Sequence, residues 1–196
     1  PAVQNLACFG DSTGSVTWSV AGGTPVFTIN ILNTTTGTNY GTQTSGLPAG
    51  NYTATVTDSK SCTDTENFVI NQPAQLQYTQ NLVQISCNPI GGYTLGQICV
   101  TALTGGTAPF TYTLVDLTGG APNQVFVSAT GANHCFTGVD FGIYDLIVTD
   151  ANGCTLVKSN LVMTNPPSDL NIITTPTIPS CAAGATVQVD LAGSLP

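Results

Sequence analysis

The sequence predicts an all-β protein built of tandem immunoglobulin-like β-sandwich modules that are stabilised by disulfides. Three observations lead to this prediction. Short segments alternate apolar and polar residues, turns rich in Gly and Pro separate them, and one cysteine-ended motif occurs twice. Each repeat has room for roughly seven strands in about 75 to 95 residues, which is the size of an immunoglobulin-like sandwich. No segment of helix length shows an apolar stripe free of Gly and Pro.

The repeated motif sets the expected domain organisation. Residues 52–63 read YTATVTDSKSCT, and residues 144–155 read YDLIVTDANGCT. The pattern starts a third time near the C-terminal end of the chain. We therefore predict a first repeat at 1–73, a second repeat at 74–167 and the beginning of a third, truncated repeat at 168–196.

The individual strands follow from the same alternation. In SVTWSV, Val16, Trp18 and Val20 share one face, so we expect Trp18 in the core rather than as a platform that stacks on a sugar ring. Similar segments, rich in Val, Ile, Thr and aromatic residues, lie at 26–32, 124–130, 144–150 and 160–164, with two more in the third repeat at 170–175 and 185–191.

The motif itself predicts a tyrosine corner in each complete repeat. Gly50 or Gly142 permits a tight bend, and Tyr52 or Tyr144 follows it. The tyrosine ring can lie on the core while its hydroxyl reaches back to a backbone group. The aspartate of each Val-Thr-Asp is expected to begin the next turn by accepting hydrogen bonds from nearby backbone amides.

The seven cysteines contain no CxxC pair, which favours disulfides in an oxidising, extracellular setting over a zinc site. If the closing cysteine of each repeat bonds back to the opening one, the pairs are Cys8–Cys62 and Cys87–Cys154. Cys99–Cys135 is then a second bridge in the second repeat, and Cys181 is unpaired in this fragment. Only the repeat selects this set among many pairings. Aligning the Gly-Gly pairs places Cys99 at the position of Val16, so Cys99 is expected to point inward.

Charge excludes several classes of partner. The chain has two lysines, no arginine and ten acidic residues, for a formal net charge of −8. Such a chain repels phosphate backbones, so we expect no nucleic acid partner. The apolar runs have strand length and no basic amphipathic segment is present, so we expect no membrane insertion. No signal peptide precedes Pro1, and we expect a mature or internal fragment.

The order of these elements resembles the SprB-type repeat of bacterial cell-surface adhesins. The shared pattern is G-x-Y-x-x-x-V-T-D-x-x-x-C, with an upstream cysteine, a Gly-Gly-Thr segment and a trailing Asn/Gln-Pro. GGTAPFTYTL at 105–114 and VTDANGCT at 148–155 are the closest passages. The first repeat departs from the pattern at Ser61, where glycine is preferred, and the second has an extra cysteine pair.

The resemblance implies a non-catalytic stalk in a secreted adhesin, exported by type IX secretion, displayed on the cell surface and used in attachment or gliding motility. Its implied partners are neighbouring repeats of the same chain, with surface glycans or other cell-surface proteins as further candidates. It implies no cofactor. Asp11-Ser12-Thr13 resembles a short O-glycosylation motif of such bacteria, with Ser12 as the acceptor.

Two other kinds of chemistry are weaker candidates. His134 beside Cys135 could suggest a nucleophile, but neighbours on a strand face opposite ways, so we expect a surface histidine next to a disulfide. Carboxylates near the module ends could bind calcium, but no DxDxDG loop is present, and we expect turn-forming or solvated side chains rather than a metal site. These carboxylates are Asp58, Asp64, Glu66, Asp140, Asp145 and Asp150.

Three alternatives to a stalk remain open. One is a module that binds a glycan or a protein through its loops. Another is an accessory domain of a secreted enzyme whose active domain lies elsewhere. A filament subunit is the third, because open sheet edges can pair between chains. The linkers at Gln72-Pro73 and Asn165-Pro166-Pro167 favour extended junctions between repeats, as a stalk requires.

Overall fold

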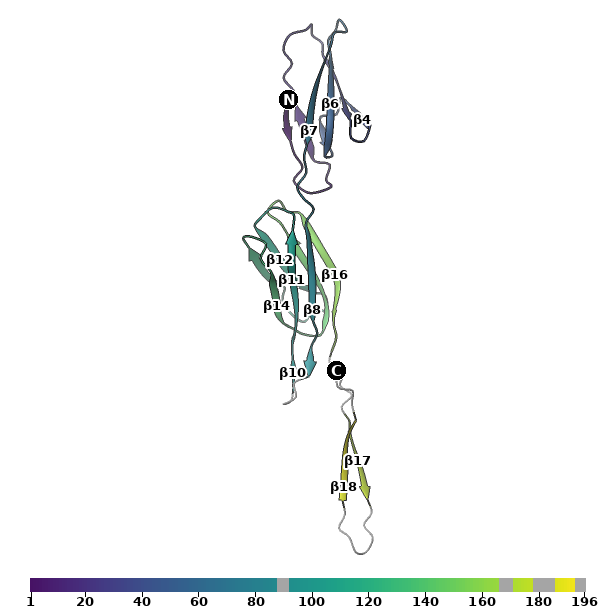
Figure 1. Cartoon of the computed structure of the whole chain (residues 1–196), viewed down its shortest axis with the longest axis vertical. Helices are drawn as coiled ribbons and strands as arrows, with labels where there is room; N and C mark the ends of the chain where they lie inside the picture. The colour runs from purple at the N-terminus through teal and green to yellow at the C-terminus, as the bar shows by residue number, and fades with distance from the viewer. Residues whose placement is uncertain (88–91, 166–170, 178–185, 193–196) are drawn as a thin grey trace.

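The computed structural model describes residues 1–87, 92–165, 171–177 and 186–192. Throughout these residues the regular structure is β, arranged in six sheets whose neighbouring strands are antiparallel. Two pairs of sheets and the hairpin of β17 and β18 follow one another along an elongated molecule (Figure 1). The prediction of an all-β protein is therefore confirmed.

The first sheet pair lies between residues 2 and 70. It has one three-stranded sheet in the order β1-β2-β5 and one four-stranded sheet in the order β4-β3-β6-β7. Its strands are β1 (Ala2–Gln4), β2 (Gly14–Thr17), β3 (Thr28–Asn33), β4 (Asn39–Gly41), β5 (Ser45–Leu47), β6 (Gly50–Thr57) and β7 (Thr63–Ile70).

The second sheet pair lies between residues 77 and 163 and has the same composition. A three-stranded sheet in the order β14-β11-β8 accompanies a four-stranded sheet in the order β13-β12-β15-β16. Its strands are β8 (Gln77–Val83), β11 (Gly96–Thr104), β12 (Phe110–Asp116), β13 (Gln124–Ser128), β14 (His134–Val139), β15 (Gly142–Thr149) and β16 (Thr155–Met163).

Two small sheets complete the described chain. β9 (Ser86–Cys87) pairs with β10 (Tyr93–Thr94) beside the second sheet pair. β17 (Asn171–Thr177) pairs with β18 (Thr186–Ala192) farther along the chain, where two strands of the third repeat were expected. Cys181 and the linker residues Pro166 and Pro167 lie outside the described residues.

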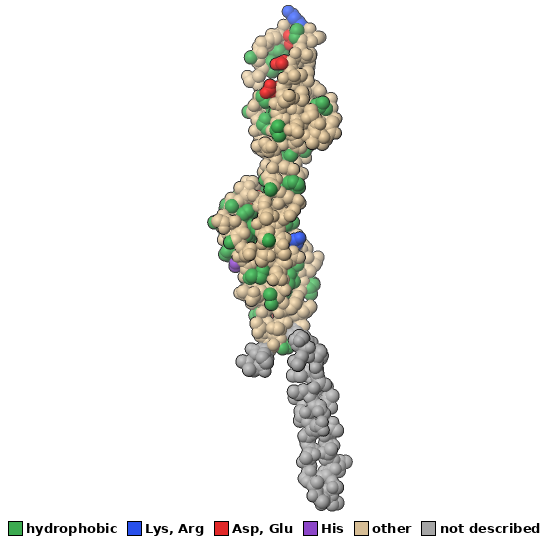
Figure 2. Space-filling model, in the orientation of Figure 1, with side chains coloured by type: hydrophobic (Ala, Val, Ile, Leu, Met, Phe, Trp, Pro, Cys, Tyr) green, Lys and Arg blue, Asp and Glu red, His purple; other side chains and the backbone are tan. Residues whose placement is uncertain are grey.

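Each sheet pair has its own hydrophobic cluster. Alternation supplies it, since every second side chain of a strand faces inward. The first cluster consists of Leu6, Val16, Ile31, Leu47, Tyr52, Ala54, Phe68 and Ile70. The second includes Ile98, Val100, Tyr112, Leu114, Leu146, Val148 and Met163 among its buried members. The outer surface is largely uncharged, as Figure 2 shows for one face.

The disulfides differ from those expected at the repeat ends. Cys8 is bonded to Cys154, with an S–S distance of 2.00 Å, while Cys62 and Cys87 have exposed free thiols. The pairings Cys8–Cys62 and Cys87–Cys154 are therefore corrected. Cys99 is bonded to Cys135, the pair that the sequence suggested.

The physical reason for the correction is strand length. β7 begins directly after Cys62 and ends at Ile70. The carbonyl of the next residue, Asn71, accepts a hydrogen bond from the amide of Leu6, which lies two residues before Cys8. Eight residues of strand span about 26 Å, whereas a disulfide needs Cα atoms within about 7 Å. Opening and closing cysteines of one repeat therefore lie at opposite ends of its sheet pair. The nine residues of β16 separate Cys154 from Cys87 in the same way.

Cys99 is buried, at 4% exposure, but it lies on the opposite side of β11 from the side expected. Its neighbours Ile98 and Val100 enter the core cluster, so Cys99 faces the other side of β11 and bonds to Cys135, directly opposite on β14. The register of β11 shifts between Thr101 and Thr104, and Ala102 has a φ of 51°. This bulge adds a residue before the Gly-Gly pair, which puts the alignment with Val16 out of phase.

Candidate functional site at the junction of the two sheet pairs

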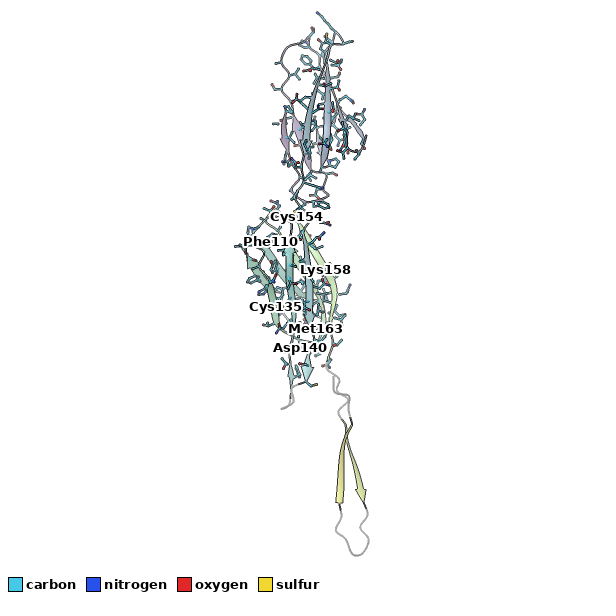
Figure 3. All side chains as sticks on the ribbon, viewed as in Figure 1. Phe110, Cys135, Asp140, Cys154, Lys158 and Met163 are labelled. Carbon is cyan, nitrogen blue, oxygen red and sulfur yellow. A yellow bond between two sulfur atoms is a disulfide. The ribbon has the colours of Figure 1, made fainter. Side chains whose placement is uncertain are left out.

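The Cys8–Cys154 disulfide joins the two sheet pairs covalently. Cys8 lies in the loop after β1, at the end of the first sheet pair, and Cys154 closes the turn between β15 and β16. Figure 3 labels Cys154 at the end of the second sheet pair that faces the first. The two Cα atoms are 5.6 Å apart, although 146 residues separate them in the sequence. We call this contact region, with the linker 71–76, the junction.

Hydrogen bonds hold the linker on both sides. The backbone amide of Gly10 donates to the Gln72 side-chain carbonyl at 2.8 Å. The amide of Gly106, on the other side, donates to the Ala74 carbonyl at 3.1 Å. A linker that is fixed at both ends restricts how the sheet pairs tilt against each other.

Gly105 lets the linker pass close to the second sheet pair. It has a φ of +70°, and a Cβ at this position would lie 2.0 Å from the Gln75 carbonyl oxygen. Because no real Cβ approaches a backbone oxygen so closely, any other residue would push the linker away. The Gly-Gly pair of the repeat motif thus has a packing role at the junction.

Asn152 adds a polar contact beside the disulfide. Its Nδ2 donates to the Ala7 carbonyl at 3.2 Å and to the Thr107 hydroxyl at 3.1 Å. The Cys154 Sγ lies 3.4 Å from the same Ala7 oxygen. A hollow of about 350 Å³ remains between the two sheet pairs, lined by residues of both and of the linker.

Asp150 presents Cys154 to the junction. Its Oδ1 accepts from the Asn152 and Cys154 amides at 2.9 Å each, and its Oδ2 accepts from the Thr107 amide at 2.8 Å. The side chain is only 5% exposed. This aspartate has the turn-forming role that the sequence suggested, and the turn sets the position of the cysteine.

Asp58 forms the matching turn at the far end of the first sheet pair. Backbone N–H groups of Thr24 and Cys62 donate to its carboxylate at 3.0 and 2.8 Å. These bonds, the Thr24 bond foremost, lower the pKa of Asp58 below its usual value.

Both motif tyrosines reach back four residues. The Tyr52 hydroxyl donates to the Pro48 carbonyl at 2.7 Å, and the Tyr144 hydroxyl donates to the Asp140 carbonyl at 3.1 Å. Tyr52 is 1% exposed and its ring stacks on Phe68 with centroids 5.0 Å apart. In both cases the hydroxyl ties the preceding loop to a tyrosine whose ring lies in the core.

His134 and Cys135 do not form a nucleophilic pair. The Cys135 sulfur is engaged with Cys99, and the His134 ring stacks on Phe126 with centroids 3.7 Å apart and meets Phe136 edge-on. His134 is half-buried rather than on the open surface, which corrects the expectation for it. Burial lowers the pKa of its imidazole.

The other carboxylates do not converge. Asp64 and Asp140 each accept from the amide of the following residue, and Asp145 accepts from the Asn160 amide. Among the described residues no group of three or more His, Cys, Asp or Glu side chains could hold a metal ion. Within the same residues no helix has the length and apolar character needed to cross a membrane.

Trp18 and Ser12 lie apart from the junction chemistry. Trp18 is half-buried, packs against the first cluster and meets Phe68 edge-on at 5.5 Å, as expected for a core residue. Ser12 is exposed in the loop between β1 and β2.

Sequence reasoning missed the junction. It treated each repeat as closed on itself, so Gly105, Asn152 and the contact of Ala7 were not singled out. A signal was available, because the strand after each closing cysteine is too long to let that cysteine reach the opening one.

These features define a disulfide-containing all-β protein with internal sequence repeats, in which a covalent junction joins consecutive sheet pairs. Residues 1–36 match the family model described as SprB repeat. This match confirms over that stretch the resemblance to SprB-type repeats. A comparison with curated proteins finds no match to the chain.

Proposed function

We propose that the chain is part of the non-catalytic repeat region of a secreted bacterial cell-surface adhesin that takes part in attachment or gliding motility. The observation that carries this proposal is the covalent junction Cys8–Cys154, which links two sheet pairs along one axis (Figure 1). The SprB match at residues 1–36 supports the same assignment, since that family is a repeat of surface adhesins.

In this proposal the chain contains tandem immunoglobulin-like modules. The first covers 1–73, the second 74–167, and 168–196 begins a third. Two sheets of three and four strands around a separate cluster in each repeat support the division. The repeat-equivalent tyrosine corners support the immunoglobulin-like assignment.

Each module acts as a spacer that resists extension. A pull that enters through β1 passes from Cys8 to Cys154 through the disulfide and leaves through β16. The segment between these cysteines, with a sequence separation of 146, then carries little of the load. A tether built in this way keeps its length under tension, and repetition adds reach for multivalent attachment.

The setting is extracellular, on the bacterial surface, after type IX secretion. The two disulfides, Cys8–Cys154 and Cys99–Cys135, support an oxidising compartment. Neighbouring repeats are the primary partners, and surface glycans or proteins are contacted elsewhere in the adhesin. The exposed Ser12 is the proposed O-glycosylation acceptor.

A replacement experiment in the bacterium that encodes the chain tests the spacer role. The segment 1–167 is exchanged for unrelated immunoglobulin-like modules of equal length, and in a second strain it is deleted. A spacer predicts that the exchange preserves attachment and gliding whereas the deletion reduces them. Loss of attachment in both strains, with surface display intact by antibody labelling, would instead support a ligand-binding module.

A further inference from the structure

Two different surfaces meet at the junction. Each sheet pair has a surface of the first kind at one end and a surface of the second kind at the other. The surface with Cys8 lies where β1 ends and β7 leads into the linker, and the surface with Cys154 lies at the turn between β15 and β16. Cys87 and Cys62 occupy the equivalent positions on the two outer ends of the molecule. Both are exposed and have free thiols.

The turn that presents Cys62 repeats the turn that presents Cys154 bond for bond. In each, one aspartate oxygen accepts from the amides two and four residues later, and the other accepts from the threonine after the Gly-Gly pair. The aspartate amide donates to the cysteine carbonyl at 2.9 Å in the first turn and at 3.0 Å in the second. Cys62 is therefore held as Cys154 is held.

The segment that presents Cys87 likewise repeats the one that presents Cys8. Two residues before each cysteine lies a buried anchor, Leu6 at 6% exposure and Ile85 at 7%. The residue before this anchor accepts a hydrogen bond, through its side-chain amide oxygen, from the backbone just after the last strand of the sheet pair. Asn5 accepts from the Asn71 amide at 2.9 Å, and Gln84 accepts from the Thr164 amide at 2.9 Å.

The hollow beside Cys62 matches the receiving half of the junction. It has a volume of about 380 Å³, against about 350 Å³ for the hollow at the junction. Four lining residues of one correspond to four of the other, namely Gly23, Asp58, Cys62 and Thr63 with Gly106, Asp150, Cys154 and Thr155. At the junction, Cys8 and Phe9 of the first sheet pair complete the wall. Among the described residues, no other sheet pair contributes side chains to the wall of the hollow beside Cys62.

We propose that Cys62 and Cys87 are the unjoined halves of two further junctions of this kind, and that each forms a disulfide with a further repeat of the same type. Cys62 takes the opening cysteine of one neighbouring repeat, and Cys87 takes the closing cysteine of another. Disulfides then run from repeat to repeat along an array and do not close within any repeat. This inference deepens the proposed spacer role and rests on the tandem arrangement.

The chemistry of each new bond is an ordinary thiol–disulfide exchange. A Cys62 thiolate attacks a small disulfide, oxidised glutathione in the test, and releases one glutathione thiolate. The partner's opening-cysteine thiolate then attacks the mixed disulfide and releases the second glutathione. Two protein thiols lose two protons and two electrons, and one small disulfide is reduced to two thiols.

A mixing experiment with the full chain tests the pairing rule. In a Cys181→Ser background, one sample carries Cys62→Ser and the other Cys87→Ser, so each retains one of the two exposed thiols. After reduction and reoxidation with oxidised glutathione, the mixture should form several-fold more disulfide-linked dimer than either sample alone. Peptide mapping should find Cys62 joined to Cys87 between chains, and Cys8–Cys154 within each chain.

Two results would overturn the proposal. One is equal dimer in the separate samples and the mixture, which would mean that the thiols pair without regard to the two surfaces. The other is the absence of interchain bonds under conditions in which Cys8–Cys154 re-forms. Neither result touches the spacer role, which the replacement strain tests by attachment.

Discussion

Cys8 follows β1 of the first sheet pair and Cys154 precedes β16 of the second, yet their Cα atoms lie 5.6 Å apart and their sulfurs are bonded. The bond crosses the junction instead of closing a repeat, because opening and closing cysteines lie at opposite ends of each sheet pair. The covalent continuity of the molecule therefore depends on how consecutive sheet pairs meet.

Breaking the junction disulfide should loosen the two sheet pairs without unfolding them. In Cys8→Ser the linker hydrogen bonds and the Asn152 contact remain without a covalent link, so we expect a broader distribution of overall dimensions by small-angle X-ray scattering. Cys62→Ser is the matched control, because Cys62 takes no part in this disulfide, and with all samples measured as isolated monomers its scattering should equal that of the parent chain. Unchanged scattering in Cys8→Ser would show that the noncovalent contacts alone fix the junction.

Gly105→Ala should displace the linker. The added Cβ would meet the Gln75 carbonyl at 2.0 Å, so the bond from the Gly106 amide to Ala74 should open and that amide should exchange with solvent faster. Gly119→Ala is the control, since Gly119 has a similar φ of +80° with nothing within 4 Å of the new Cβ. It should incur backbone strain of about 1 kcal/mol and leave Gly106 exchange unchanged.

Acid should destabilise the first sheet pair through Asp58. Its folded-state pKa is lowered, mainly by the bonds from the Thr24 and Cys62 amides, so its stabilisation is complete above the ordinary aspartate pKa and is lost as pH falls through the lower folded value. The free energy of unfolding, measured by urea titration with the fluorescence of Trp18, the one tryptophan, should therefore decrease below about pH 4.

Two variants separate this contribution from other carboxylates. Asp58→Asn should flatten the acid dependence of the Trp18 transition, because the titrating group is gone. Asp116→Asn removes another aspartate with a lowered pKa, in the second sheet pair, and should leave the Trp18 transition as it was. An equal effect of both variants would contradict a local role for Asp58.

Tyr52→Phe should lower the free energy of unfolding of the first sheet pair by about 1–2 kcal/mol, because the Pro48 carbonyl loses its donor while the ring still fits the core. Urea titration followed by far-ultraviolet circular dichroism, which reports both sheet pairs, measures this change. Tyr93→Phe, at a side chain that is 57% exposed, should change stability by no more than about 0.5 kcal/mol. If Tyr52→Phe were as stable as Tyr93→Phe, the hydrogen bond from the Tyr52 hydroxyl would not stabilise the first sheet pair.

The strands and the roles of several turn residues could be predicted from the sequence, because they depend on local chemistry. Alternating apolar positions predicted the strands, because side chains on a strand change face at every residue. Tyr52, Tyr144, Asp58 and Asp150 could be given roles, since each bonds to backbone no more than four residues away or to the Gly-Gly turn of its own repeat. Cys99 could be paired with Cys135, although a bulge at Ala102 reversed the face on which it lies.

The partner of Cys8 was not readable in this way. A repeat shows that Cys8 and Cys87 are equivalent, and that Cys62 and Cys154 are equivalent, but equivalence does not say which ends come together. Strand length puts the two cysteines of one repeat far apart, and the short linker brings ends of different repeats into contact. The disulfide at the junction therefore depends on how the two sheet pairs meet, which is set by the folded strands and by the linker that packs against Gly105.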